Sequence, residues 1–244
     1  MAVLTGFAQR SLLYVLLAHL GAVSLVWNLL ACVLHPLVPA RPGTAVGRAV
    51  IAHVYRFFWA TAQVLGMMRI DVAALEAIGA EAGGLIVAAN HPTMLDALVL
   101  VSRLPRGACI MKGELMRNVF LGAGARLARY IRNDSPLEMI RRAVDCVREG
   151  GHLVMFPEGT RTVQRPLNGF RPGITLIAQL AQVPIQTVII ETDSLYLRKG
   201  WPIWRAPAFP IEIRVRLGER FAPEPDHQAL LARLERYFRG ELRT

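Results

Sequence analysis

Residues 85–96 read LIVAANHPTMLD, and this stretch decides the fold. Its first five residues form a short apolar run, which is typical of a strand buried on both faces of a sheet. Pro92 ends the strand, and a helical pattern follows at 95–102. His91 is therefore expected at the carboxyl end of a buried strand, where α/β proteins build their ligand sites.

The same alternation of apolar runs and amphipathic stretches continues on both sides of this strand, over residues 69–244. It predicts an α/β sandwich with a largely buried central sheet. The segment 196–210 contains Trp201, Trp204 and three prolines and is expected to be a loop. Its aromatic content suits a membrane interface, and packing over the sheet edge is an equally ordinary interpretation. Strands are expected at 69–72, 85–89, 108–112, 130–132, 153–156, 185–190 and 211–217, and helices at 95–102, 114–127, 136–149, 173–182 and 227–239.

A second strand and turn lie at residues 152–162, which read HLVMFPEGTRT. Gly159 permits a tight backbone approach, and Arg161 offers a planar fork for a phosphate or a carboxylate. Arg165 and Arg171 follow, before a helix whose first amides also favour anions. The pattern indicates an anion site, although a surface turn with a solvated arginine is the plainer alternative.

The charge of the chain is unevenly distributed. The 244 residues include 28 Lys+Arg and 18 Asp+Glu, and 53% are hydrophobic, which excludes intrinsic disorder. Every acidic residue lies at or after Asp71, so residues 1–70 are apolar and basic. This segment suits an anionic lipid surface. Nucleic acid is not expected as a partner, because the arginines are scattered through apolar sequence rather than gathered on a polar face.

Residues 1–68 are expected to form membrane-associated helices. The segment 11–40 has no charged residue, and 11–34 is apolar and long enough to cross a bilayer as a helix. Gly21 could instead break this run and produce a re-entrant hairpin, so both arrangements remain open. Residues 44–68 resemble an amphipathic interfacial helix, with burial against the following domain as the alternative. More arginine follows the apolar run than precedes it, which favours a domain on the cytoplasmic face of the inner membrane.

His91 and Asp96 suggest acid–base chemistry. Their side chains would point about 140° apart on a regular helix, so they meet only if the Pro92 turn folds the chain back. Asp96 would then fix the imidazole tautomer and leave the other ring nitrogen free to take a proton from a hydroxyl. A capping or core histidine with a solvated aspartate is the alternative.

The two quoted stretches resemble the sequence boxes of one family. NHPTMLD matches the NHx4D box, and FPEGTR matches the FPEG(T/S)R box, of the glycerolipid acyltransferases typified by 1-acylglycerol-3-phosphate O-acyltransferase. The resemblance covers residues 69–217 and implies a mixed central sheet flanked by helices, of the glycerol-3-phosphate acyltransferase type. It also implies transfer of a fatty acyl group from acyl-CoA or acyl-carrier protein to a lysophospholipid, most simply 1-acylglycerol 3-phosphate, without a cofactor or a metal.

The resemblance assigns roles residue by residue. It implies that His91 is the general base and Asp96 its charge partner, so that residues 69–244 would be the catalytic domain. The residues that it assigns to substrate binding are Asn90, Lys112, Arg132, Glu158, Gly159, Thr160 and Arg161.

One departure from the family leaves the acceptor open. Where the family's second box usually has an arginine, this chain has Asn133, and the usual glycine is missing. Arg132 could substitute, although on a strand its side chain points to the opposite face. The same chemistry on another acceptor, such as a lyso-ornithine lipid or a specialised polyene-type product, is therefore an alternative. A non-catalytic binder of membrane lipid or acyl-carrier protein is a further one, but a binder needs neither a base nor its carboxylate.

Overall fold

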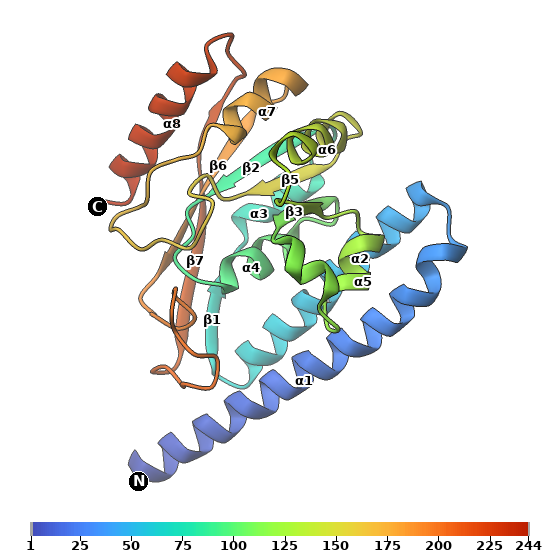
Figure 1. Ribbon diagram of the computed structural model, residues 1–244. Coiled ribbons are helices and arrows are strands. Elements are labelled where there is room, and N and C mark those ends of the chain that lie inside the picture. The colour runs from blue at the N-terminus through green and yellow to red at the C-terminus, as the bar shows by residue number, and fades with distance from the viewer. Residues whose placement is uncertain (1, 244) are drawn as a thin grey trace.

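The computed structural model describes residues 2–243 and builds them into one sheet with helices on both sides (Figure 1). The helices are α1 (Ala2–Leu37), α2 (Ala40–Val64), α3 (Ala74–Ala80), α4 (Leu95–Arg103), α5 (Gly122–Leu127), α6 (Pro136–Arg148), α7 (Gly173–Ala181) and α8 (His227–Glu241), with a 3₁₀ helix η1 at Gly113–Arg117. The strands are β1 (Met68–Asp71), β2 (Leu85–Ala89), β3 (Gly107–Met111), β4 (Ile131–Arg132), β5 (His152–Met155), β6 (Ile185–Thr192) and β7 (Ile211–Phe221).

The seven-stranded sheet has the order β1-β7-β6-β2-β5-β3-β4. Strands β2 to β6 are parallel to one another, whereas β7 is antiparallel to β6 and carries β1 parallel to itself. The expectation of a mixed central sheet flanked by helices is confirmed. Because β2 to β6 run the same way, the turns that follow them all lie at one edge of the sheet.

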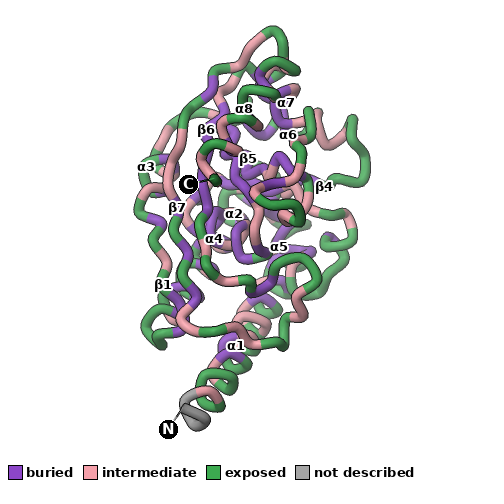
Figure 2. Tube along the Cα trace, turned by 90° about the vertical axis from the view of Figure 1, so that its left-hand side faces the viewer, coloured by how far each residue is buried: buried purple, intermediate pink, exposed green. Residues whose placement is uncertain are grey.

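The sheet has a hydrophobic core on each face, and β2 contributes to both. Leu85, Val87 and Ala89 pack in the core under α2, α3 and α4, whereas Ile86 and Ala88 pack in the core under α6, α7 and α8. Side chains of a strand alternate between faces, so a strand that is apolar at every position must be covered on both. Figure 2 shows this burial at the centre of the molecule and mostly exposed residues along α1.

The N-terminal helices differ in length from the prediction. Helix α1 is longer than the expected 11–34 and continues through Gly21, so within this structure the segment is a single helix and not a hairpin. Helix α2 begins at Ala40 and ends at Val64, earlier than the expected 44–68, because Met68 already belongs to β1. Helix α1 is the one described helix long and apolar enough to cross a membrane.

One further expectation is wrong, and one helix was not expected. The helix predicted at 114–127 is divided into η1 and α5, because the side chain of Asn118 accepts a hydrogen bond of 2.8 Å from the backbone N–H of Phe120 and fixes a turn. Helix α3 was not expected. The segment 196–210 has no helix or strand, as predicted.

Candidate active site

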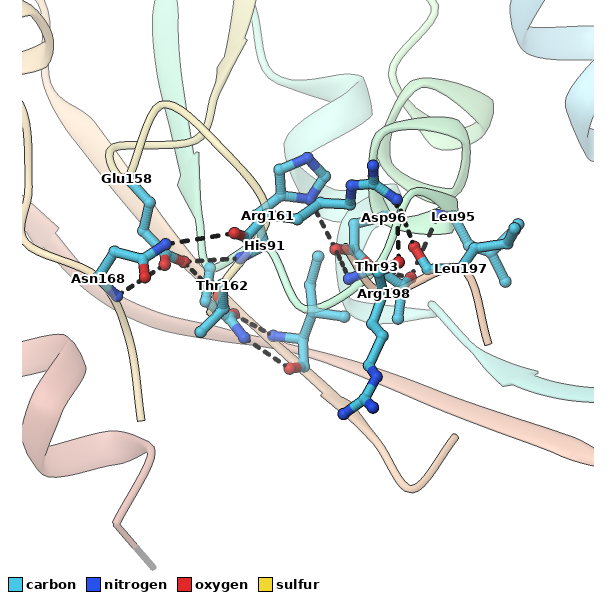
Figure 3. A network of polar contacts seen from close by, with 12 residues as sticks. His91, Thr93, Leu95, Asp96, Glu158, Arg161, Thr162, Asn168, Leu197 and Arg198 are labelled. Atoms are coloured by element: carbon cyan, nitrogen blue, oxygen red, sulfur yellow. Dashed lines mark hydrogen bonds and ion pairs between the residues drawn. The ribbon is translucent and has the colours of Figure 1, made fainter. Parts of the chain in front are cut away.

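The turn after β2 brings His91 and Asp96 together (Figure 3). Nδ1 of His91 lies 2.8 Å from Oδ2 of Asp96. The two side chains meet because residues 91–94 form a turn and α4 begins only at Leu95. Asp96 is 1% exposed, so its carboxylate is buried rather than solvated.

Thr93 holds the carboxylate in place. Its backbone N–H donates to Oδ2 of Asp96 and its hydroxyl donates to Oδ1, each at 2.8 Å. The hydroxyl oxygen also accepts the N–H of Leu95 at 3.2 Å. These bonds resemble a capping box, but Thr93 lies one residue before the N-cap of α4, Met94, and its hydroxyl accepts the N–H of Leu95 instead of that of Asp96. The sequence interpretation missed Thr93, although the T-x-x-D pattern at 93–96 was the signal for it.

The imidazole of His91 is oriented on two sides. Asp96 accepts the Nδ1 hydrogen, so Nε2 of the neutral ring carries the free lone pair, and no residue of 2–243 bonds to it. The ring of Phe156 stacks on it, with centroids 3.9 Å apart and planes 16° apart. Burial raises the pKa of the Asp96 carboxyl, and the hydrogen bonds from His91 and Thr93 oppose that rise. A fixed imidazole with one accessible nitrogen is the geometry of a general base.

Glu158 connects the two motif turns and is 2% exposed. Its Oε1 accepts the backbone N–H of His91 at 3.1 Å and the hydroxyl of Thr162 at 2.7 Å. Its Oε2 accepts the backbone N–H of Asn168 at 2.8 Å. Thr162 in turn donates its N–H to the carbonyl of His91 at 2.7 Å. We therefore assign Glu158 to positioning His91 instead of the substrate contact expected from the sequence.

Two arginines lie at the turn after β5. Gly159 has a φ of +69°, and a Cβ there would lie 2.5 Å from Nε of Arg171, so the Arg171 side chain packs against the glycine. Arg161 donates from Nη1 to the carbonyls of Leu197 and Arg198 at 2.8 and 3.2 Å, and Figure 3 shows its guanidinium on the same side of the turns as the imidazole. Among residues 2–243 neither arginine pairs with a carboxylate, which leaves both charges available to an anion.

The other predicted site residues differ in burial and in contacts. Lys112 and Arg132 are exposed at the carboxyl ends of β3 and β4, on the same edge as His91, but Arg132 is paired with Asp134. Asn90 is buried and exchanges two hydrogen bonds of 2.8 Å with the backbone of Ile190. Its side chain ties β2 to β6, which is a structural task rather than the expected substrate contact. Thr160 is half-buried in the turn with Glu158.

Comparison with known proteins places this geometry in a family. The model of the family described as Acyltransferase matches residues 69–191, half of the chain, including both motif turns. The chain belongs to the acyltransferase family. This acyltransferase is 26% identical over 234 residues to the 1-acyl-sn-glycerol-3-phosphate acyltransferase of Pseudomonas aeruginosa, with 93% of the chain and 86% of that relative covered.

Two further similarities cover different lengths. The acyltransferase is 30% identical to the 1-acyl-sn-glycerol-3-phosphate acyltransferase of Limnanthes alba over 53% of the chain and 48% of that relative. Among solved structures, it resembles the crystal structure of the 1-acyl-sn-glycerophosphate (LPA) acyltransferase PlsC from Thermotoga maritima. That match has a TM-score of 0.75 at 19% identity and covers 100% of this chain and 97% of the other. The fold that the two structures share therefore includes α1 and α2.

Proposed function

We propose that this acyltransferase moves a fatty acyl group from acyl-CoA or acyl-carrier protein to the hydroxyl of 1-acylglycerol 3-phosphate, which gives phosphatidic acid. The observation that carries the proposal is the His91–Asp96 pair at 2.8 Å at the carboxyl edge of the sheet, which leaves Nε2 without a partner among residues 2–243. The choice of acceptor is supported by the relatives from Pseudomonas and Limnanthes, whose names specify it.

His91 acts as the base in this reaction. Nε2 takes the proton of the acceptor hydroxyl as the oxygen attacks the thioester carbonyl. The imidazolium that forms is stabilised by the buried carboxylate of Asp96, held by Thr93. When the tetrahedral intermediate collapses, the carbon–sulfur bond breaks, and the imidazolium returns its proton to the departing thiolate. These reaction steps require no covalent acyl-enzyme and no cofactor.

Arg161 and Arg171 hold the phosphate of the acceptor in this proposal. The Arg171 side chain packs against Gly159, the Arg161 guanidinium donates to the carbonyls of Leu197 and Arg198, and neither is paired with a carboxylate in residues 2–243. Arginine suits this task because its planar fork donates two parallel hydrogen bonds to a phosphate. Lys112 at the end of β3 adds positive charge to the same edge.

A different acceptor remains the second candidate, and one observation favours it. The arginine adjacent to the divergent position, Arg132, already pairs with Asp134 and so has less capacity for a phosphate. Asn133 offers an amide where a cation is usual. An acceptor with a smaller negative charge at its head group, such as a lyso-ornithine lipid, would then be used.

The protein is membrane-associated, and we propose that α1 lies in the plane of the membrane with the catalytic domain on the cytoplasmic face. Leu13, Leu16 and Ala31 of α1 are buried against the domain. Asn28 accepts hydrogen bonds from the N–H groups of Ala123 and Gly124 at 2.7 and 3.1 Å, at the start of α5. A helix that crossed the bilayer away from the domain would lose these contacts. Its outer face is exposed and apolar and suits lipid.

An acceptor panel tests the proposed reaction. Purified protein receives one labelled acyl-CoA and, separately, 1-acylglycerol 3-phosphate and several other lysolipids, and the products are resolved by mass. We expect phosphatidic acid and acceptor-dependent release of free thiol. A protein that ignores 1-acylglycerol 3-phosphate but acylates another lysolipid refutes the acceptor and retains the chemistry.

His91→Ala tests the base. We expect loss of acyl transfer with folding and membrane binding retained, whereas His227→Ala, on α8 and outside the site, keeps ordinary activity. If His91→Ala remains active, the mechanism is wrong.

A further inference from the structure

The segment 194–205, which we call the tryptophan loop, exposes apolar side chains that the proposed reaction does not use. Trp204 is 69% exposed, Ile203 is 43% exposed and Leu195 is 40% exposed. Exposed tryptophan is typical of the interface between lipid head groups and acyl chains, where its amphipathic ring is most stable. The loop therefore presents an apolar tip to whatever lies beside this edge of the protein.

The tryptophan loop is also positively charged. It contains Arg198, Lys199 and Arg205, and no aspartate or glutamate. All three cations are exposed, and the guanidinium of Arg205 lies 4.7 Å from the ring centroid of Trp201. Basic side chains next to an exposed tryptophan are complementary to the anionic surface of a membrane.

The loop is continuous with the apolar surface of α1. The hydroxyl of Tyr14, a half-exposed residue of α1, donates to the carbonyl of Trp204 at 2.9 Å. A small enclosed cavity of about 60 Å³ lies between the two, with Leu13 and Leu16 of α1 on one side and Ile203 on the other. Figure 1 shows the loop, in orange, beside β1 and near the N-terminal half of α1. A membrane that covers the outer face of α1 would reach the tip of the loop.

The other side of the loop contacts the active site. The carbonyls of Leu197 and Arg198 accept both hydrogen bonds that Arg161 makes. The carbonyl of Leu197 also accepts the N–H of Met94, in the turn between His91 and Asp96, at 3.1 Å. Leu197 has a φ of +59° and is 3% exposed, so its backbone is held in a less common conformation by these contacts. One short segment thus links the exposed tryptophan to the arginine of the second motif.

We propose that the tryptophan loop is a second lipid-contacting element, which binds the anionic bilayer beside α1 and holds Arg161 in its substrate-facing position. The inference rests on the membrane association and the phosphate-binding role of Arg161 proposed above. Docking of the loop orders the Leu197 and Arg198 carbonyls, and these fix the guanidinium. The enzyme would therefore work faster on an acceptor in an anionic bilayer than on the same acceptor in solution.

A fluorescent label tests the contact without reference to activity. The Trp204→Cys variant, with the exposed Cys32 replaced by serine, is labelled with an environment-sensitive dye and mixed with phosphatidylglycerol vesicles. Leu180→Cys in the same background is the matched control, because Leu180 is an exposed apolar residue of α7 on the other sheet face. We expect a blue shift at position 204 and none at 180. Equal responses at the two positions, or a response at 204 to an acidic carrier protein but not to vesicles, would overturn the proposal.

Charge variants test the head-group contact and the link to Arg161. Each basic residue near an anionic surface strengthens binding about fivefold, so Arg198→Gln with Lys199→Gln should weaken vesicle binding about 25-fold. Arg236→Gln with Arg243→Gln removes the same charge from the C-terminal region, and we expect little change. The first pair should also lower the ratio of the rate on bilayer acceptor to the rate on a short-chain soluble acceptor. Equal loss of vesicle binding in the two double variants refutes the loop contact. An unchanged ratio of bilayer rate to soluble rate refutes the link to Arg161. Absence of any acyl transfer, with the difference in vesicle binding retained, refutes only the proposed function.

Discussion

Replacing Asp96 with asparagine tests whether the buried carboxylate acts on His91 by its charge. Asparagine has the same shape, and its oxygen can take the place of Oδ2, which accepts from Nδ1 of His91 and from the N–H of Thr93. Its amide can then donate to the Thr93 hydroxyl oxygen in place of Oδ1. The side chain at 96 keeps three hydrogen bonds in this orientation, with the direction of the Thr93 hydroxyl bond reversed, so the main effect of the substitution is to remove the charge.

The expected loss follows from the geometry. With Nδ1 and Oδ2 at 2.8 Å, the charges of imidazolium and carboxylate are centred roughly 4 Å apart, which is worth about 4 kcal/mol at an effective dielectric constant near 20. That energy stabilises the transition state and not the bound substrate, so kcat should fall about 10³-fold with KM nearly unchanged. Thiol release from acyl-CoA at saturating acceptor gives kcat directly.

Thr93→Val provides the complementary measurement. Valine removes the hydroxyl that bonds Asp96 and Leu95 but leaves the His91–Asp96 pair. We expect about 1–3 kcal/mol less free energy of unfolding and a loss in kcat of less than about tenfold. A kcat for Asp96→Asn within tenfold of the parent protein would refute the reasoning, because Asp96 would then serve only to cap α4.

Three other changes separate the remaining contacts. Gly159→Ala forces a non-glycine residue into a φ of +69° and displaces Arg171. We expect a free energy of unfolding about 1–2 kcal/mol lower and a higher KM for the acceptor. An unchanged KM would contradict the role of Arg171 in binding the phosphate. Asn28→Leu leaves two buried N–H groups unpaired and should cost about 2–3 kcal/mol in detergent, whereas equal thermal stability would favour an α1 that leaves the domain. Burial and the nearby Arg106 lower the pKa of His152 in the folded protein. As the pH drops below about 6.5, the histidine of the unfolded chain takes up a proton before that of the folded chain, so the free energy of unfolding should fall. A His152→Gln protein with the same pH dependence of Tm would show that His152 is not the cause.

The parts of the site that could be predicted from the sequence depend on contacts within one turn. The LIVAA run required a doubly covered strand, and Pro92 required a turn, so the location of His91 followed from local pattern alone. The T-x-x-D pattern would have placed Thr93 as well. Sequence motifs singled out Glu158 but could not give its contacts, because its partners include the backbone groups of His91 and Asn168 and only the folded chain brings them near.

The parts that could not be predicted depend on contacts between distant segments. After the turn that Asn118 fixes, the start of α5 is stabilised by Asn28, about a hundred residues earlier, which takes two N–H groups that a continuous helix would have used internally. The contact of Arg161 with the carbonyls of the tryptophan loop likewise has no signal in either segment. No periodicity or motif in a sequence predicts which distant loop an arginine side chain will contact.

The same contacts explain how an acid-containing site can attract an anionic acceptor. Asp96 and Glu158 are almost completely buried, and each accepts hydrogen bonds from the chain, so their charges are directed at His91 and at backbone N–H groups. Within the described chain the Arg161 guanidinium bonds to backbone carbonyls, and neither it nor Arg171 has a carboxylate partner there. In the site that we propose, the charge that faces the substrate is therefore positive, although both motifs contribute a carboxylate. Burial also keeps water away from the Asp96 carboxylate, which strengthens its attraction to the imidazolium at the moment when the proton is transferred.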